Sequence, residues 1–422
     1  MKVLLISANT ETINMPTLPL GLACVAAATQ RAGYDVSLIN LMFETDPKAS
    51  IRDSIRDLGP GVIGVSVRNI DDQDMEHPRF LLSAAREVVA TCRSASSAPV
   101  VLGGAGYSVF PESALRYTGA DMGIQGEGEV VFPALVQRIV GGAQVWDLPG
   151  ICLPGRAPER RSFVANLDDL PLPEPRLWLP ADAGSRGLWA PVQSRRGCPM
   201  DCSYCSTGMI EGRSIRRCSP DRIVSWLADL SKAGSRSLNF VDNTFNLPSA
   251  YAKDLCRKIA QAGLDINWWC IIYPKWVDPE LVELMRRAGC SQISFGFESG
   301  SDRMLRNFNK RFNREEVRTI SAMFQEAGIE RRGFLLLGGP GETKDSVEES
   351  LSFADSLNLD SLNTTAGLRI YPETPLARVA LAEGIIEPDE DLLGPRFYMA
   401  GELRDWLPER LAAYKASRPW VN

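Results

Sequence analysis

The stretch Leu188-Trp-Ala-Pro-Val-Gln-Ser-Arg-Arg-Gly-Cys198-Pro-Met-Asp-Cys202-Ser-Tyr-Cys205 decides the fold, because it places three closely spaced cysteines directly after a strand-like run. In a chain with this cysteine content the spacing would arise by chance only about 0.006 times. Three thiolates on one loop can hold three irons of a [4Fe–4S] cubane and leave the fourth iron open. A zinc ribbon is the alternative, and it would have to recruit Cys218 as its fourth ligand.

Alternating strands and helices follow this motif to about residue 375. Strand-like runs occur at 237–243, 268–273, 292–299, 333–339 and 362–371. Helical patterns separate them at 219–233, 249–262, 278–288, 313–327 and 343–357. Together with the strand before the cysteines, this pattern predicts a partial (β/α)6 barrel, since the closed form needs eight strands.

The first 150 residues alternate in the same way. Short apolar runs of strand length occur at 2–8, 35–41, 62–67, 99–104 and 122–126. Helical patterns separate most of them, which predicts an α/β fold with a doubly wound, Rossmann-like parallel sheet. Such sheets bind ligands at the carboxyl ends of their strands.

Proline-rich sequence separates the two patterns. The segments NLDDLPLPEPRLWLP and GICLPGRAPERR suit a linker better than a buried element. The expected division is an N-terminal sheet domain, a linker, the partial barrel and a short C-terminal segment, at 1–150, 151–185, 186–375 and 376–422.

Composition excludes several classes of protein. The chain carries 46 Lys+Arg against 52 Asp+Glu, and this acidic balance argues against a nucleic-acid partner. No run of eighteen apolar residues predicts a membrane span, and no signal peptide precedes the first strand, so the cytoplasm is the expected location. A single histidine, His77, excludes most multi-histidine metal sites and disfavours a Ser–His–Asp triad.

From residue 190 to about 375 the chain resembles the radical S-adenosylmethionine (SAM) superfamily, in its CxxxCxxC motif and in the order of its strand ends. The resemblance implies a [4Fe–4S] cluster on Cys198, Cys202 and Cys205. It also implies that Tyr204 packs against the SAM adenine and that Lys310 meets the SAM carboxylate. The other SAM positions that it implies are Asp242, Asn243, Glu298, Ser299, Gly339 and Tyr371.

The first half resembles the cobalamin-binding domain that precedes the barrel in one branch of these enzymes. Four segments carry the resemblance: PTLPLGLACVAAA, VIGVSVRNIDD, VVLGGAGYSVFPE and MGIQGEGE. The DxHxxG motif of histidine-ligated B12 proteins is absent, so the resemblance implies cobalamin without a histidine beneath the cobalt, and Arg68 facing the lower side of the corrin. The remaining cobalamin positions are Gly103, Gly104, Gly126, Glu127 and Gly128.

The two resemblances together imply a class B radical SAM C-methyltransferase. Such an enzyme moves a methyl group from SAM, via methylcobalamin, to a carbon of a small natural-product intermediate, expected here to be aromatic or heterocyclic. They also imply an external one-electron donor of flavodoxin or ferredoxin type. A cobalamin-dependent cyclase or rearrangement enzyme, and a B12 sensor with an inactive barrel, are the open alternatives. The residues assign no catalytic base, substrate carbon or oligomeric state, although Tyr107, Tyr273, Trp268, Trp269 and Trp276 are candidates to line a cavity.

Overall fold

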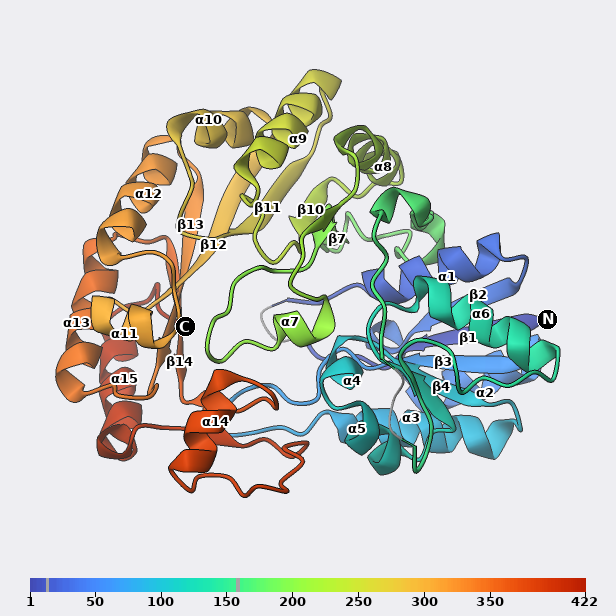
Figure 1. Cartoon of the computed structure of the whole chain (residues 1–422). Helices are drawn as coiled ribbons and strands as arrows, with labels where there is room; N and C mark the ends of the chain where they lie inside the picture. The colour runs from blue at the N-terminus through green and yellow to red at the C-terminus, as the bar shows by residue number, and fades with distance from the viewer. Residues whose placement is uncertain (13–14, 157–159) are drawn as a thin grey trace.

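The computed structural model describes residues 1–12, 15–156 and 160–422, so residues 157–159 of the expected linker lie outside the described residues. Two six-stranded sheets organise the chain, one in each half, and they form two lobes side by side (Figure 1). In the described ranges no helix is long and apolar enough to cross a membrane. The expected α/β class and the order of the two folds are confirmed.

The first sheet has the strand order β2-β1-β3-β4-β5-β6 and is parallel except for β6. Its strands are β1 (Lys2–Ser7), β2 (Asp35–Asn40), β3 (Val62–Ser66), β4 (Val100–Gly103), β5 (Met122–Ile124) and β6 (Ile151–Cys152). The central strand β3 is apolar up to its last residue, Ser66, and its first four residues are buried, as expected of a parallel strand covered on both faces. Because β6 pairs with β5, the sheet extends two residues beyond the boundary expected at residue 150.

Helices cover both faces of this sheet. Those of the first half are α1 (Leu20–Arg31), α2 (Pro47–Leu58), α3 (Leu82–Ala95), α4 (Ala105–Val109), α5 (Pro111–Thr118) and α6 (Gly128–Val140). Helices α1 and α6 pack together, and α3 packs against α2 and α5. Local sequence sets their ends: Asp46 caps α2 by accepting a hydrogen bond from the Ala49 N–H, and Gly59, with a φ of +59°, ends it.

The second sheet is wholly parallel and has the order β14-β13-β12-β11-β10-β7. Its strands are β7 (Ala190–Val192), β10 (Ser237–Phe240), β11 (Asn267–Ile272), β12 (Cys290–Glu298), β13 (Glu330–Leu337) and β14 (Ser361–Ala366). Its main helices are α8 (Pro220–Lys232), α9 (Ser249–Ala262), α10 (Pro279–Arg287), α11 (Asp302–Asn307), α12 (Arg314–Glu326) and α13 (Lys344–Ser356). The sheet curves and the helices lie on its convex side (Figure 1), which is the expected partial barrel.

Strand alternation separates the two tryptophans of β11. Trp268 is fully buried among Phe240 and Phe245, and its indole N–H donates to the Ala288 carbonyl at 2.6 Å. Trp269 points to the opposite, concave face and is half-buried. Trp268 is therefore a core residue, and Trp269 is available to a ligand inside the barrel.

Short elements complete the chain. The two-stranded hairpin of β8 (Arg195–Arg196) and β9 (Arg216–Arg217) encloses the cysteine motif and α7 (Thr207–Ile210). The strand expected at 362–371 breaks at Gly367, whose φ is +79°, and β15 (Leu368–Arg369) pairs instead with β16 (Phe397–Tyr398). Helices α14 (Pro375–Ala382) and α15 (Trp406–Ala416) lie in the C-terminal part.

Candidate cofactor and substrate site

The three cysteines lie on a loop that neighbouring elements hold at several points. The Cys198 N–H donates to the Gly212 carbonyl at 3.1 Å, and the Ser203 N–H donates to the Phe308 carbonyl at 3.1 Å. The Leu376 N–H, in the first turn of α14, donates to the Ser203 carbonyl at 2.9 Å. The loop thus has a fixed backbone, which a preorganised metal site requires.

The thiols themselves suit a cluster better than a single ion. Cys198 and Cys202 are partly buried and Cys205 is exposed, and all three are free. Burial raises the pKa of Cys198 to about 11, so a bound cation is needed to keep its thiolate. Among the described residues no three Cys, His, Asp or Glu side chains are close enough to share one metal ion. A cubane puts each thiolate on a different iron, so these residues fit the cluster.

The alternative, a zinc site, would need Cys218 as its fourth ligand, and Cys218 does not lie at the loop. Cys218 is buried in the hydrophobic core, and its carbonyl accepts a hydrogen bond from the Tyr251 hydroxyl at 2.8 Å. The other cysteines outside the motif are also buried. The described chain therefore offers three thiols at the loop and no partner that would complete a tetrahedral site.

Gly197, just before the first cysteine, is a position where only glycine fits. Its φ is +87°, and a Cβ there would lie 2.1 Å from the Ser214 carbonyl oxygen. We expect Gly197→Ala to shift the loop and to lower the iron content of the reconstituted protein at least about twofold, because such strain costs about 1–3 kcal/mol. Iron per chain is the measurement.

Gly187→Ala is the matched control, because Gly187 has a φ of +65° and a Cβ added there would meet no atom within 4 Å. It carries the same backbone strain without the clash. Equal iron contents in the two variants would show that the close approach to Ser214 does not matter.

Tyr204, Glu298 and Lys310 meet beside the cysteine loop. The Tyr204 hydroxyl donates to Glu298 Oε1 at 2.9 Å, and Lys310 Nζ donates to the same oxygen at 3.1 Å. Glu298 ends β12 with a φ of +62° and folds back over Gly296, where a Cβ would lie 2.4 Å from its carboxylate. Burial lowers the pKa of Lys310, but the Glu298 carboxylate and Tyr204 outweigh this and raise it, so the ammonium stays charged.

The other positions assigned to SAM divide into two groups. Asn243 lines the cavity described below, and Gly339 leaves room for Phe308, whose ring would lie 2.5 Å from a Cβ there. Asp242 is fully buried, and it accepts hydrogen bonds from Ser194 and Arg195 rather than facing open space. The remaining two positions are engaged with neighbours: Ser299 bonds to Ser350 at 2.9 Å, and Tyr371 packs against Phe110 of the first half.

A cavity of about 480 Å³ lies between the two halves. Its first wall is the carboxyl edge of the first sheet, and its second wall is the edge of the barrel at Pro191, Gln193, Val241 and Asn243. It contains every position assigned to cobalamin: Arg68, Gly103, Gly104, Gly126, Glu127 and Gly128.

Small side chains at the strand ends leave the space for this cavity. A Cβ on Gly104, whose φ is +101°, would lie 2.5 Å from the Val67 carbonyl oxygen. The hydroxyls of Ser66, which ends β3, and Ser108, in α4, add polar groups to the lining. His77 is exposed on a loop and does not line the cavity, so the residues fit a corrin that lacks a histidine ligand.

A hydrogen-bonded chain crosses the cavity wall, and no local sequence pattern reveals it. Arg196 Nη2 donates to Glu129 Oε1 at 2.5 Å, and Arg196 Nε donates to Gln193 Oε1 at 3.0 Å. Gln193 donates to Glu211, whose other oxygen accepts from the Gly197 N–H and from Asn243. The chain joins α6 of the first half to the residue before Cys198.

Glu127 takes part in the same contact between halves. Its carboxylate accepts from Arg216 at 2.6 Å and from the Val164 N–H at 2.7 Å, and Arg196 lies 3.4 Å away. The side chains of Glu127, Glu129, Arg196 and Arg216 are at most 12% exposed. Glu127 therefore lines the cavity and also anchors the two halves.

Comparison with known protein families assigns both halves. Residues 192–354 match the radical SAM superfamily, and residues 6–136 match the B12 binding domain. Over 399 residues the chain is 28% identical to an uncharacterized methyltransferase of Pyrococcus horikoshii, covering 92% of this chain and 84% of that protein. It is 24% identical to a tryptophan 2-C-methyltransferase of Streptomyces laurentii, covering 89% of this chain and 74% of the relative.

Solved structures share the fold over the whole chain. The radical SAM methyltransferase TsrM of Kitasatospora setae, with cobalamin and a [4Fe–4S] cluster bound, superposes with a TM-score of 0.87 at 22% identity, covering 100% of this chain and 92% of TsrM. The cobalamin-dependent radical enzyme OxsB, with aqua-cobalamin and SAM bound, superposes with a TM-score of 0.82 at 17% identity, covering 99% of this chain and 66% of OxsB.

Proposed function

Because the chain belongs to the cobalamin-binding radical SAM enzymes, we propose that it transfers a methyl group from SAM, by way of cobalamin, to a carbon of a small natural-product intermediate. It is a cobalamin-dependent radical SAM methyltransferase, and its relatives over about nine-tenths of the chain are named methyltransferases. One observation carries the proposal: a single cavity is lined by the positions assigned to cobalamin and, across from them, by Asn243 and Glu211 beside the cysteine loop.

Each half of the chain has residues for a different cofactor. Cys198, Cys202 and Cys205 would hold the cluster, and the charged ammonium of Lys310 would be available to the SAM carboxylate. The first sheet would hold the corrin, with Gly103, Gly104 and Gly126 leaving room for it in the cavity. When bound, the cluster supplies an electron to SAM and the corrin carries the methyl group. The protein orients both groups and keeps water from the space between them.

Arg68 is the assigned neighbour of the lower corrin face. It lines the cavity, and a guanidinium carries only donors, so it cannot ligate cobalt. The cyclase alternative has no support from the relatives that cover about nine-tenths of the chain, since these are named for methyl transfer. The Streptomyces laurentii relative acts on tryptophan, which supports a small aromatic or heterocyclic substrate here.

Further parts of the proposal come from chemistry and composition. Cleavage of SAM needs one electron, so we include an external donor of flavodoxin or ferredoxin type. The net charge of −6 supports a substrate other than nucleic acid. A cytoplasmic location, and the division at 150, 185 and 375, remain predictions from the sequence.

The test is to purify the chain anaerobically with hydroxocobalamin, reconstitute iron and sulfide, and compare it with Cys205→Ala. We expect a retained corrin spectrum, about four irons per chain, and S-adenosylhomocysteine formation. Cys205→Ala should keep the corrin and lose most of the iron. A protein that binds iron and cleaves SAM without retaining a corrin would contradict the assignment of the first half.

A further inference from the structure

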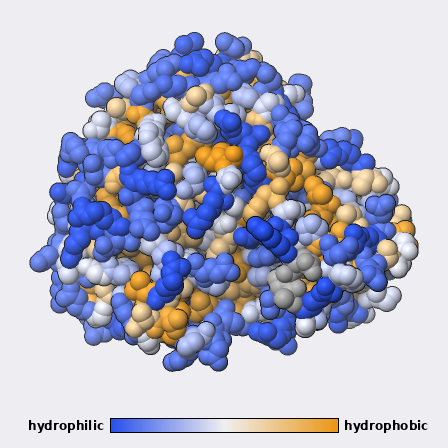
Figure 2. Space-filling model, in the orientation of Figure 1, coloured by the Kyte–Doolittle hydropathy of each residue, from blue (hydrophilic) through white to orange (hydrophobic). Residues whose placement is uncertain are grey.

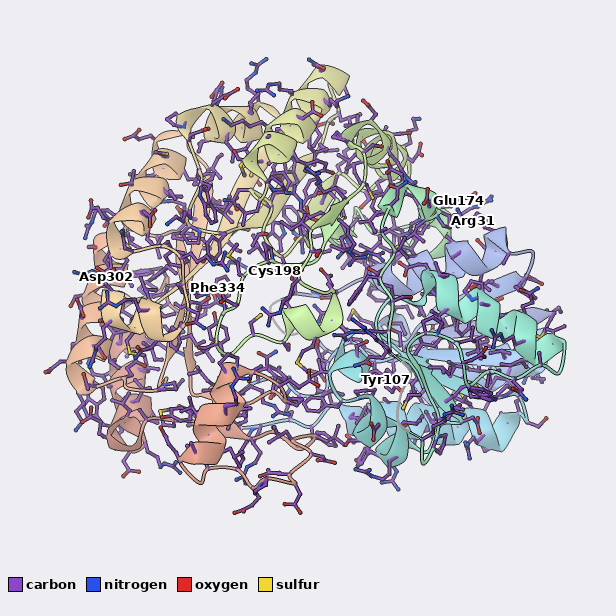
Figure 3. All side chains as sticks on the ribbon, in the orientation of Figure 1. Arg31, Tyr107, Glu174, Cys198, Asp302 and Phe334 are labelled. Carbon is purple, nitrogen blue, oxygen red and sulfur yellow. The ribbon has the colours of Figure 1, made fainter. Side chains whose placement is uncertain are left out.

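Arg332 lies on the concave face of the barrel sheet. Its neighbour Arg331 points to the convex side, where it donates to the Leu357 and Asn358 carbonyls. Gly333 faces the same convex side, since a Cβ there would lie 2.6 Å from Leu359. Side chains alternate along a strand, so Arg332 and Phe334 point into the barrel. Figure 3 labels Phe334 on this strand.

Strand register places Arg332 in a row that crosses four strands. Ile271 pairs with Ser294, Ser294 pairs with Arg332, and Arg332 pairs with Ser361. The Arg332 Nε donates to Ser361 Oγ at 3.3 Å, which confirms that the two side chains share this face. The row thus presents one cation between two hydroxyl side chains, next to an apolar residue.

The charge of Arg332 has no partner of opposite sign among the residues that the structure describes. Its bond to Ser361 uses only one of its five N–H donors. By contrast, the buried Arg369 pairs with Asp71 at 2.7 Å, and Arg195 pairs with Asp242 at 3.2 Å. Arg332 is only partly exposed, and a partly enclosed cation gains most from an anion that fits its planar fork.

Apolar side chains lie near this cation on the same face. Ile271 lies in the middle of the sheet yet is 38% exposed, while its neighbours Cys270 and Ile272 are buried. Trp269, Phe334 and Leu336 are half-buried on the same concave face. Figure 2 shows apolar surface near the centre of this side of the molecule. The inner face therefore places the Arg332 guanidinium beside apolar side chains, and the exposed Glu330, two residues before Arg332, lies on the same face without forming an ion pair with it in the described structure.

We propose that Arg332 binds an oxyanion of the substrate, a carboxylate or a phosphate, while Ile271 and Phe334 contact the substrate's apolar body. The inference rests on the proposed function and narrows its substrate to small apolar anions. The anion lies partway down the barrel, so the other end of the substrate points to the carboxyl ends of the strands, where the cysteine loop lies. No other described residue on this row carries a charge.

The test measures binding to the reconstituted holoenzyme by calorimetry. The probes are indole-3-propionate, its uncharged amide, and phenyl phosphate. We expect the wild type to bind an oxyanion probe about ten- to a hundredfold more tightly than the amide, because hydrogen bonds to charged groups contribute that much. Arg332→Met should remove the preference, and Arg332→Lys should keep only part of it, since an ammonium lacks the fork.

Arg318→Met is the matched control, because Arg318 is 49% exposed on α12, on the convex side. It should bind all three probes like the wild type. Tighter binding of phenyl phosphate than of the carboxylate would select a phosphorylated substrate, and the reverse order a carboxylic acid. Either order supports the oxyanion site.

Two outcomes overturn the inference: no oxyanion probe binds at millimolar concentration, or the preference survives in Arg332→Met. Corrin and iron contents are measured on the same samples. A wild type that lacks either cofactor contradicts the proposed function, whereas a wild type that holds both but shows no charge preference contradicts only the role of Arg332.

Discussion

Arg196→Met is expected to destabilise the folded chain by about 3–5 kcal/mol and to loosen both cofactor sites together. Glu129 would lose its ion-pair partner while its side chain remains only 4% exposed, and an unpaired buried carboxylate is costly. The substitution would also break the bond to Gln193, and through Gln193 and Glu211 it would disturb Gly197, next to Cys198. Denaturant unfolding of the apo chain measures the first effect.

Corrin retention and iron content measure how far the two cofactor sites are loosened. The double variant Arg196→Met with Glu129→Leu separates this loosening from the loss of folding stability. The double variant should recover much of the stability, because it removes both charges at once. It should still retain less corrin and less iron than the wild type, since the hydrogen-bonded chain stays broken. Arg286→Met, in an exposed pair with Glu283, is the control and should cost less than about 1 kcal/mol. Full corrin and iron in Arg196→Met would show that the chain of bonds does not couple the sites.

The repeating elements of both folds could be predicted from sequence because parallel strands are buried on both faces. A strand such as β3 is then a short, mostly apolar run with a helix on either side, and this signal is local. In β13 only the part from Gly333 onward is apolar. The two-residue strands β8, β9, β15 and β16 have no such signal. They pair with one another, β8 with β9 and β15 with β16, in two separate two-stranded sheets, and these pairings form only when the folded structure brings the segments together.

The site residues also fall into two groups: those that a local sequence pattern reveals and those that only the folded structure reveals. The cysteine spacing and the glycines at strand ends are local patterns, so the cluster loop and the lining of the cavity could be predicted. Asp242 and Ser299 also stand at strand ends, but their side chains turn to Arg195 and Ser350, and the sequence does not encode that direction. Arg196 and Glu129 are 67 residues apart, and Arg332 acquires its neighbours from three other strands. Such contacts are products of tertiary structure.

Arg369→Met is expected to destabilise the chain by about 3–5 kcal/mol, because it leaves Asp71 buried without its cation. The two side chains are each 2% exposed, and Arg369 Nε lies 2.7 Å from Asp71 Oδ2. Arg369 also donates to the Ile370 and Leu392 carbonyls and lies 5.5 Å from the centre of the Phe110 ring. Asp71 follows β3 of the first sheet and Arg369 ends β15, so this pair joins the two halves.

A double-mutant cycle with Asp71→Leu measures the interaction energy of Asp71 and Arg369. Calorimetry of the unfolding transition tests whether this pair makes the two halves unfold together. The double variant should be more stable than either single variant, since burying two apolar side chains avoids the unpaired charge. With this contact gone, the halves keep the pairs of Arg196 and Arg216 with Glu127 and Glu129 as their remaining buried ionic links in the described chain. We therefore expect the apo wild type to unfold in one transition and Arg369→Met to unfold in a broader or split transition. Arg236→Met, which removes an ion pair whose side chains are 65% and 80% exposed, should leave the transition sharp. If Arg369→Met costs less than about 1 kcal/mol and unfolds as sharply as that control, the halves are held together by apolar packing, and the buried ion pairs set only their relative orientation.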